Sequence, residues 1–115
     1  MMRNYFLING KSGKQYRFLI YELNNEDIKN NTSLNNNGGI YIFCKHIIPN
    51  NIKLIYCGKT HNYMERFENH HKINDIMKYK PNILGLLFED NEDIRTKIEI
   101  DILEGNIFIC NTQHN

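Results

Sequence analysis

The sequence predicts an α/β (α+β) fold: a small central three-stranded, mainly antiparallel sheet flanked by helices, with an added N-terminal β-hairpin. Strand-length runs of aromatic and branched residues, separated by turn chemistry, predict the strands. Stretches with capping residues and a helical period of apolar side chains predict the helices. A chain of 115 residues fits one domain, 1–115, and leaves little room for a second independent core.

The first predicted element is the N-terminal hairpin. Residues 5–8 and 16–23 are rich in aromatic and branched side chains, and residues 9–14 between them carry strong turn chemistry. Asparagine dominates residues 24–37, which predicts an exposed connection. The hairpin and its connection make up residues 1–37, and we expect the connection over residues 24–37 to carry no chemistry.

A second hairpin is predicted from residues 40–48 and 52–57. Both runs are strand-like, and Pro49-Asn50-Asn51 separates them. This hairpin would bring Tyr41 and Tyr56 toward the same end of the sheet.

Two further apolar runs predict strands. The nearly continuous run over residues 83–88 predicts a central strand that is buried on both faces. Residues 107–110 form a shorter run, which predicts an edge strand. Pro81 ends a helix that is predicted through residues 73–79, just before the central strand.

A helix is predicted after Gly58, with Asn62 as its N-cap and Glu65 three residues later in a capping-box relation. Asn62, Arg66 and His70 are spaced i, i+4 and i+8, so we expect them to share one side of this helix. That side would face the strand ends that carry the two tyrosines.

The last helix is predicted from about residue 90 to residue 104, before Gly105-Asn106. At about 100° per residue, a broad arc of apolar side chains would face the protein: Ile94, Ile98, Ile100, Ile102 and Leu103. Glu99 falls inside this arc, where a carboxylate must be paired or must bind a metal.

Composition limits the expected partners and compartment. Lys and Arg number 14 against 13 Asp and Glu, a net charge of +1, so we expect any binding to a polyanion to be local. An odd number of cysteines without a CxxC pair indicates a reducing compartment, and Cys44, Cys57 and Cys110 are expected to be small core residues. Because the sequence has no membrane-length apolar run and no signal-peptide pattern, the expected location is cytoplasmic (intracellular), with no membrane partner.

Three pieces of the sequence carry a family resemblance: Gly39-Ile40-Tyr41, Tyr56-Cys57-Gly58 and Arg66. Over residues 38–111 the chain resembles the GIY-YIG nuclease superfamily, with a cysteine where the second family motif usually has a branched residue. The N-terminal hairpin lies outside the match. The resemblance makes Gly39 and Gly58 the structural glycines of the two motifs.

The resemblance implies a metal-dependent endonuclease that hydrolyses phosphodiester bonds in DNA. Tyr41 would be the general base or would orient the attacking water, and Tyr56 would offer a second hydroxyl to the same phosphate. Arg66 would lower the pKa of the phenol and grip phosphate oxygens. His70 would orient Tyr41 or assist proton transfer.

The same resemblance assigns the cofactor and the substrate contacts. Glu99 would hold one divalent ion, Mg²⁺ (or Mn²⁺), as a Lewis acid at the leaving oxygen. Lys59, Asn62 and Asn111 would bind the substrate. The expected partner is nucleic acid, DNA above all. Since the sequence has no DNA-binding motif beside the nuclease core, substrate choice would come from the domain itself or from a protein partner.

Each assignment has a structural alternative. Tyr41 and Tyr56 also fit an ordinary cross-strand aromatic pair. Glu99 also fits an ion pair with Arg95, one turn earlier on the same helix. Glu104 is a second candidate for the carboxylate that corresponds to the family's metal-binding glutamate.

Two other sites fit the sequence poorly. A zinc site built from Cys57 and the nearby histidines matches no common ligand spacing. A P-loop at Gly58-Lys59-Thr60 lacks its first glycine, because Lys53 stands at that position.

Two alternative functions belong beside the nuclease. A non-catalytic nucleic-acid-binding or accessory module with the same fold would leave Tyr41, Arg66 and Glu99 apart, or blocked by internal salt bridges. A structural partner-binding domain would show an exposed apolar patch and no cleft at the tyrosines. Convergence of the candidate side chains therefore separates the three hypotheses.

Overall fold

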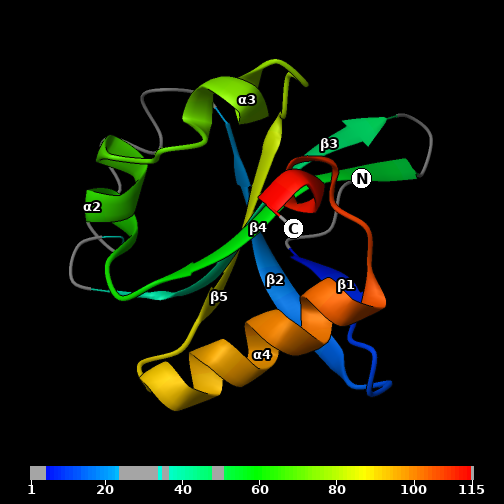
Figure 1. Cartoon of the computed structure of the whole chain (residues 1–115), viewed down its shortest axis with the longest axis vertical. Helices are drawn as coiled ribbons and strands as arrows, with labels where there is room; N and C mark the ends of the chain where they lie inside the picture. The colour runs from blue at the N-terminus through cyan, green and yellow to red at the C-terminus, as the bar shows by residue number, and fades with distance from the viewer. Residues whose placement is uncertain (1–4, 24–33, 35–36, 48–50, 115) are drawn as a thin grey trace.

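The computed structural model describes residues 5–23, 34, 37–47 and 51–114, and in this part of the chain five strands form one antiparallel sheet (Figure 1). The strands are β1 (Tyr5–Asn9), β2 (Gln15–Glu22), β3 (Gly39–Ile47), β4 (Asn51–Thr60) and β5 (Ile83–Phe88), in the spatial order β1-β2-β5-β3-β4. The prediction of an α+β chain with an antiparallel sheet is confirmed. Most of the predicted connection over 24–37, and the turn at 48–50, lie outside the described residues.

The N-terminal hairpin belongs to the central sheet, so the prediction of a three-stranded sheet with a separate hairpin was wrong. Strand β2 pairs with one side of β5, with Leu19 opposite Leu86, and β3 pairs with the other side, with Tyr41 opposite Leu86. Strand β5 is therefore central, as predicted, and its residues 83–86 are buried. A central strand must pair both rows of its backbone groups, and the hairpin supplies the second partner.

Helices cover both faces of the sheet (Figure 1). Helices α2 (Tyr63–Glu68) and α3 (Ile73–Met77) pack on one face, and the longer helix α4 (Glu92–Gly105) packs on the other. Successive residues of β3 alternate between the two cores: Ile40 and Ile42 belong to the core under α4, whereas Tyr41 and Phe43 belong to the core under α2 and α3. Tyr41 thus faces the side from which α2 can reach it.

The three cysteines are free and buried, as the sequence predicted: Cys44, Cys57 and Cys110. They fill space in the two cores and do not form disulfides. None of the helices in the described part of the chain has the length and apolarity needed to cross a bilayer.

The C-terminal residues form a 3₁₀ helix, η2 (Ile109–His114), where an edge strand over 107–110 was predicted. Asn111 in η2 reaches the backbone of Cys57 in β4. Its Oδ1 accepts from the Cys57 N–H at 2.9 Å, and its Nδ2 donates to the Cys57 carbonyl at 3.0 Å. One side-chain amide thus pairs backbone groups at the sheet edge that a further strand would otherwise pair, which explains the wrong prediction.

Helix α4 faces the sheet with a different arc from the predicted one. Ile102 is fully buried and Ile98 packs against the same core, but Ile94 and Ile100 are 44% and 48% exposed. The rotation of α4 is fixed by Asp101, whose carboxylate accepts hydrogen bonds from the Ser12 backbone and hydroxyl and from the Tyr16 hydroxyl. These long-range bonds to the hairpin turn Ile94 and Ile100 outward, which the helical period alone did not reveal.

Regular antiparallel pairing puts Tyr56 on the same side of the sheet as Tyr41, and a β-bulge follows directly after it. Phe43 lies opposite Tyr56, and the register then shifts by one residue, which leaves Ile55 as the extra residue on β4. Ile55 and Tyr56 consequently both pack in the core that contains Tyr41. The bulge therefore adds Ile55 to the core around the two tyrosines.

Replacing Ile102 and Ile100 separately tests this assignment of the α4 face. Ile102→Ala should lower the free energy of unfolding by about 2–5 kcal/mol, because it opens a cavity in a packed core. Ile100→Ala, on the same helix, should change it by about 0.5 kcal/mol or less. Urea unfolding followed by circular dichroism measures both, and equal losses would contradict the observed face.

Candidate active site

The ring of Tyr41 lies over Gly58, its cross-strand partner. A Cβ atom built on Gly58 would lie 2.5 Å from both Cζ and Oη of Tyr41, far inside van der Waals contact. Tyr41 has no exposed surface, and its ring centroid lies 6.1 Å from that of Tyr56 and 5.3 Å from that of Phe67. The glycine of the second motif is therefore required by the tyrosine of the first.

Gly39 has an equally specific reason to be glycine. Its φ is +154°, and a Cβ atom there would overlap the carbonyl oxygen of Leu87 and lie 2.5 Å from the hydroxyl of Tyr63. Tyr63, at the start of α2, is fully buried, and its hydroxyl lies 2.8 Å from the Leu87 carbonyl and 3.0 Å from the Ile40 carbonyl. Tyr63 thereby fixes the first turn of α2 on β3 and β5 and positions Arg66.

Two nitrogen atoms from different segments meet the phenol oxygen of Tyr41. Arg66 Nε donates to it at 3.2 Å, and His70 Nε2 lies 2.8 Å from it. The backbone N–H of Lys72 donates to His70 Nδ1 at 3.0 Å, so Nδ1 carries no proton. In the neutral imidazole the proton is on Nε2, which therefore donates to Tyr41.

Burial and the neighbouring Arg66 have opposite effects on the pKa of Tyr41. Burial raises its pKa above the ordinary value of 10, while the hydrogen bond and positive charge of Arg66 lower it. Burial also raises the pKa of Tyr56, which the Arg66 charge lowers and the Glu99 charge raises. For His70, burial and then the charge of Arg66 lower the pKa to about 4, so its imidazole is neutral at pH 7.

His70 reaches Tyr41 from beyond the end of α2, so the prediction that it lies on the helix was wrong. Helix α2 ends at Glu68, and Asn69 is its C-cap. The backbone N–H of Asn69 bonds the carbonyl of Arg66, which closes the last turn one residue before His70. The i, i+4, i+8 stripe therefore ends at Arg66, and the link from α2 to α3 brings His70 to the phenol.

The predicted N-cap of α2 is confirmed. Asn62 accepts a hydrogen bond from the Glu65 backbone N–H at 3.1 Å. The reciprocal half of the capping box is replaced, because the hydroxyl of Thr60 accepts the Asn62 N–H at 3.1 Å. Thr60 is a positioning residue that the sequence analysis missed.

Glu99 lies on α4, which packs on the opposite face of the sheet from Tyr41. Its negative charge raises the pKa of both Tyr56 and Cys57, which are adjacent on β4. The guanidinium of Arg95, its predicted alternative partner, is bound by Glu92 at 2.9 and 3.1 Å, and it donates to two backbone carbonyls before α4. Glu104 is exposed near the other end of the helix.

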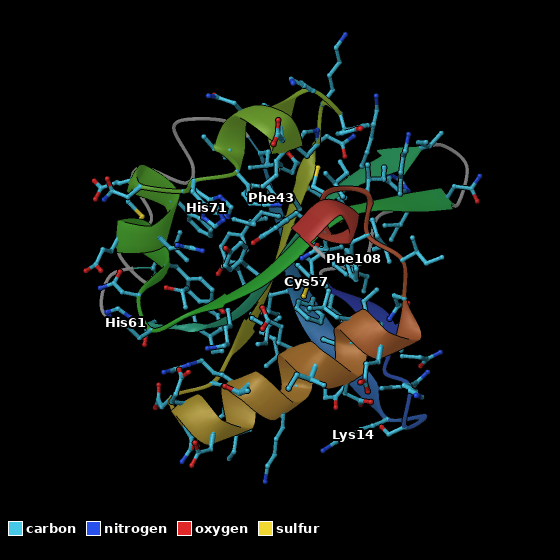
Figure 2. All side chains as sticks on the ribbon, viewed as in Figure 1. Lys14, Phe43, Cys57, His61, His71 and Phe108 are labelled. Atoms are coloured by element: carbon cyan, nitrogen blue, oxygen red, sulfur yellow. The ribbon has the colours of Figure 1, made fainter. Side chains whose placement is uncertain are left out.

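A surface pocket of about 410 Å³ lies beside Arg66 at the end of β4. It is lined by Lys59, Thr60, His61, Glu65, Arg66, Asn69 and Glu92. In Figure 2, His61 lies where β4 leads into α2. The Lys59 ammonium, predicted to bind substrate, lies in this lining and forms a 2.7 Å ion pair with Glu92. Arg66 therefore has one contact with Tyr41 and also borders an open polar pocket.

Metal-ligating side chains do not cluster in this site. Among the described residues, no group of three or more His, Cys, Asp or Glu side chains could together hold a metal ion. The carboxylate whose charge acts on Tyr56 is that of Glu99, a hard oxygen donor. One carboxylate with waters and substrate oxygens is a donor set that Mg²⁺ accepts, so the residues present fit such an ion.

No family model matches this chain, and comparisons with curated proteins and with solved structures give no match either. The interpretation of the site therefore rests on its motifs and on its geometry.

The lowered pKa of His70 predicts a pH dependence of stability. The pKa is about 4 in the folded protein and 6.5 as the ordinary value, so the unfolded chain binds the proton first. The contribution of His70 is fully present above about pH 6.5 and is lost as the pH falls toward 4. In urea unfolding at several pH values, His70→Gln should flatten this part of the profile. His61→Gln, at an exposed histidine, is the matched control, and an unchanged slope in the His70 variant would contradict a buried neutral His70.

Proposed function

We propose that this protein is a metal-dependent endonuclease of the GIY-YIG type, which hydrolyses phosphodiester bonds in DNA with Tyr41, Arg66 and Glu99 as its reactive residues. The observation that carries the proposal is the pair of nitrogen donors on the Tyr41 oxygen, at 2.8 and 3.2 Å. An ordinary cross-strand aromatic pair needs no such donors. They stabilise negative charge on the phenol oxygen, as a general base requires.

The tautomer of His70 supports one of its two predicted roles. Because Nδ1 accepts from the Lys72 N–H, the Nε2 atom facing Tyr41 carries the proton and cannot accept another. His70 therefore orients Tyr41 and stabilises its anion. In the proposed reaction, Tyr41 as phenolate takes the proton of the attacking water, whose oxygen bonds to phosphorus as the bond to the leaving oxygen breaks.

Arg66 connects the base to the bound phosphate. Its guanidinium borders the pocket while its Nε donates to Tyr41, so a phosphate in the pocket would lie next to the proposed base. The planar fork of an arginine fits two phosphate oxygens. Lys59 lies in the same lining, and a phosphate would compete with Glu92 for its ammonium.

Glu99 is the residue that would hold the divalent ion. When bound there, Mg²⁺ or Mn²⁺ would supply positive charge at the leaving oxygen. Asn111 supports the same region from the backbone side, since its amide fixes Cys57 next to Tyr56.

A non-catalytic nucleic-acid-binding or accessory module is the second candidate. Two observations favour it: Tyr41 has no exposed surface, and Lys59 and Glu92 form an ion pair at the pocket. Such a module would bind DNA at the pocket without cutting it. Both candidates therefore predict that the protein binds DNA, and only the nuclease predicts that it cuts DNA.

A cleavage assay separates them. Purified protein is incubated with labelled single-stranded, duplex and branched DNA, with and without Mg²⁺ or Mn²⁺, and cutting is expected only with metal. Glu99→Gln and Arg66→Ala should each lower the rate by about a hundredfold or more, because each removes charge stabilisation in the transition state. Glu104→Gln, on the same helix, is the matched control. Full activity in both the Glu99 and Arg66 variants, or cutting with chelator present, would rule out this mechanism.

The pH profile tests the role of Tyr41. Because the pKa of Tyr41 is raised, only a small fraction is phenolate near neutrality, and the single-turnover rate should rise about tenfold per pH unit up to about pH 9. Tyr41→Phe should abolish cutting, whereas Tyr56→Phe should lower the rate and keep the slope. A plateau near pH 7 in the wild type would exclude Tyr41 as the base.

A further inference from the structure

Charge is unevenly distributed along this nearly neutral chain. Residues 45–80 contain seven Lys and Arg against three Asp and Glu, whereas residues 89–104 contain two against seven. The basic stretch runs through β4, α2 and α3, and the acidic stretch is α4 with the turn before it. The elements of the basic stretch therefore differ from the helix that carries most of the acidic stretch, and Lys59 and Glu92 form an ion pair between the two (Figure 1).

Two lysines of the basic stretch lie directly opposite each other on neighbouring strands. Lys45 on β3 pairs with Lys53 on β4. Side chains alternate along β3, so Lys45 follows Tyr41 and Phe43 on the face that α2 and α3 cover. Like charges directly opposite each other destabilise a sheet, so this pair is not explained by stability.

The loop between α3 and β5 adds to the same surface. The Lys53 ammonium lies 5.8 Å from the ring centroid of Tyr79, and Tyr79 is 41% exposed. Lys80 follows with a φ of +54°, a left-handed conformation that is costly for a lysine. Asn82 holds the loop on β3, since its side chain bonds both the N–H and the carbonyl of His46.

We call this surface the basic face; it consists of Lys45, Lys53, Lys78, Tyr79 and Lys80. Within the described residues, Lys78 bonds Asp75, and none of the ion pairs involves Lys45, Lys53 or Lys80. Lys53 and Lys80 are exposed. The face is thus a cluster of cations around an exposed aromatic ring, held by rigid strands.

We propose that the basic face binds single-stranded nucleic acid, with lysines on backbone phosphates and Tyr79 stacked on a base. Positive charge combined with an exposed aromatic ring is the combination that binds single strands without sequence preference. The basic face and Arg66 lie on the same side of the sheet, because Lys45 shares the face of Tyr41 on β3 and Arg66 contacts Tyr41. A nucleic-acid strand bound to the basic face would therefore run along the side of the sheet that carries Arg66. Only the identity of this strand as substrate rests on the proposed nuclease function; binding itself does not.

Fluorescence anisotropy tests binding, with a labelled oligothymidylate of about 15 nucleotides and chelator present to prevent any cutting. Lys53→Ala/Lys80→Ala should weaken binding about tenfold and reduce the slope of log affinity against log salt by about one to two. Lys11→Ala/Lys97→Ala removes the same charge from the hairpin and α4, and should have no effect. Tyr79→Ala should weaken binding at least fivefold, with recovery in Tyr79→Phe.

The outcomes separate this inference from the nuclease proposal. If the two lysine pairs change binding equally, or if Tyr79→Ala binds as the wild type does, the basic face is not the binding surface. If polyglutamate competes with the oligonucleotide equally well and its binding is unaffected by Tyr79→Ala, the face serves acidic proteins. Binding that follows the expected pattern in a protein that cuts no DNA would support the face and reject the nuclease. If the protein cuts DNA with metal and the Lys53→Ala/Lys80→Ala variant binds the oligonucleotide as the wild type does, the result would support the nuclease and reject the basic face.

Discussion

The hydrogen-bonded oxygen of Tyr41 is the point on which the arrangement of this molecule depends. Strand β3 supplies the phenol, Gly58 on β4 leaves room for its ring, and two other segments supply the nitrogens that hold it. Arg66 reaches it because Tyr63 anchors the first turn of α2 to the carbonyls of two strands. Each motif residue is thus explained by its contact with another, and the motifs act as one packed unit.

Strand β4 lies at the edge of the described sheet, and Arg66 is the member of this unit that borders the open pocket. Four of the five strands of the described sheet lie to one side of β4, while α2 and α4 flank it and η2 covers the backbone of Cys57. Helix α2, which carries Arg66, and helix α4, which carries Glu99, lie on opposite faces of the sheet. Most of the basic stretch 45–80 lies on elements other than the acidic helix α4, so the net charge of +1 is the sum of two uneven charge distributions.

The elements that depend on neighbours in sequence were predicted correctly, and the features that depend on long-range contacts were not. The capping signal of Asn62 and the apolar run of β5 depend on neighbours in sequence, so both were predicted correctly. The bulge at Ile55 and the rotation of α4 by Asp101 depend on partners far along the chain. His70 was expected on the helix, and it contacts Tyr41 from beyond the helix end, because the spacing of a motif does not reveal where a short helix stops.

Burial and hydrogen bonding have opposite effects on the pKa of Tyr41. In the proposed mechanism their balance requires a second positive charge in addition to that of Arg66. Burial raises the pKa of the phenol, and Arg66 lowers it only in part. A phosphate entering the pocket would bring negative charge that raises the pKa further. In the proposed mechanism a cation must therefore arrive with the phosphate, and the carboxylate whose charge already acts on Tyr56 is the one able to hold it. Tyr41 would then act as a base only when substrate and ion are both bound. Phosphodiesters outside the pocket would therefore not be cut.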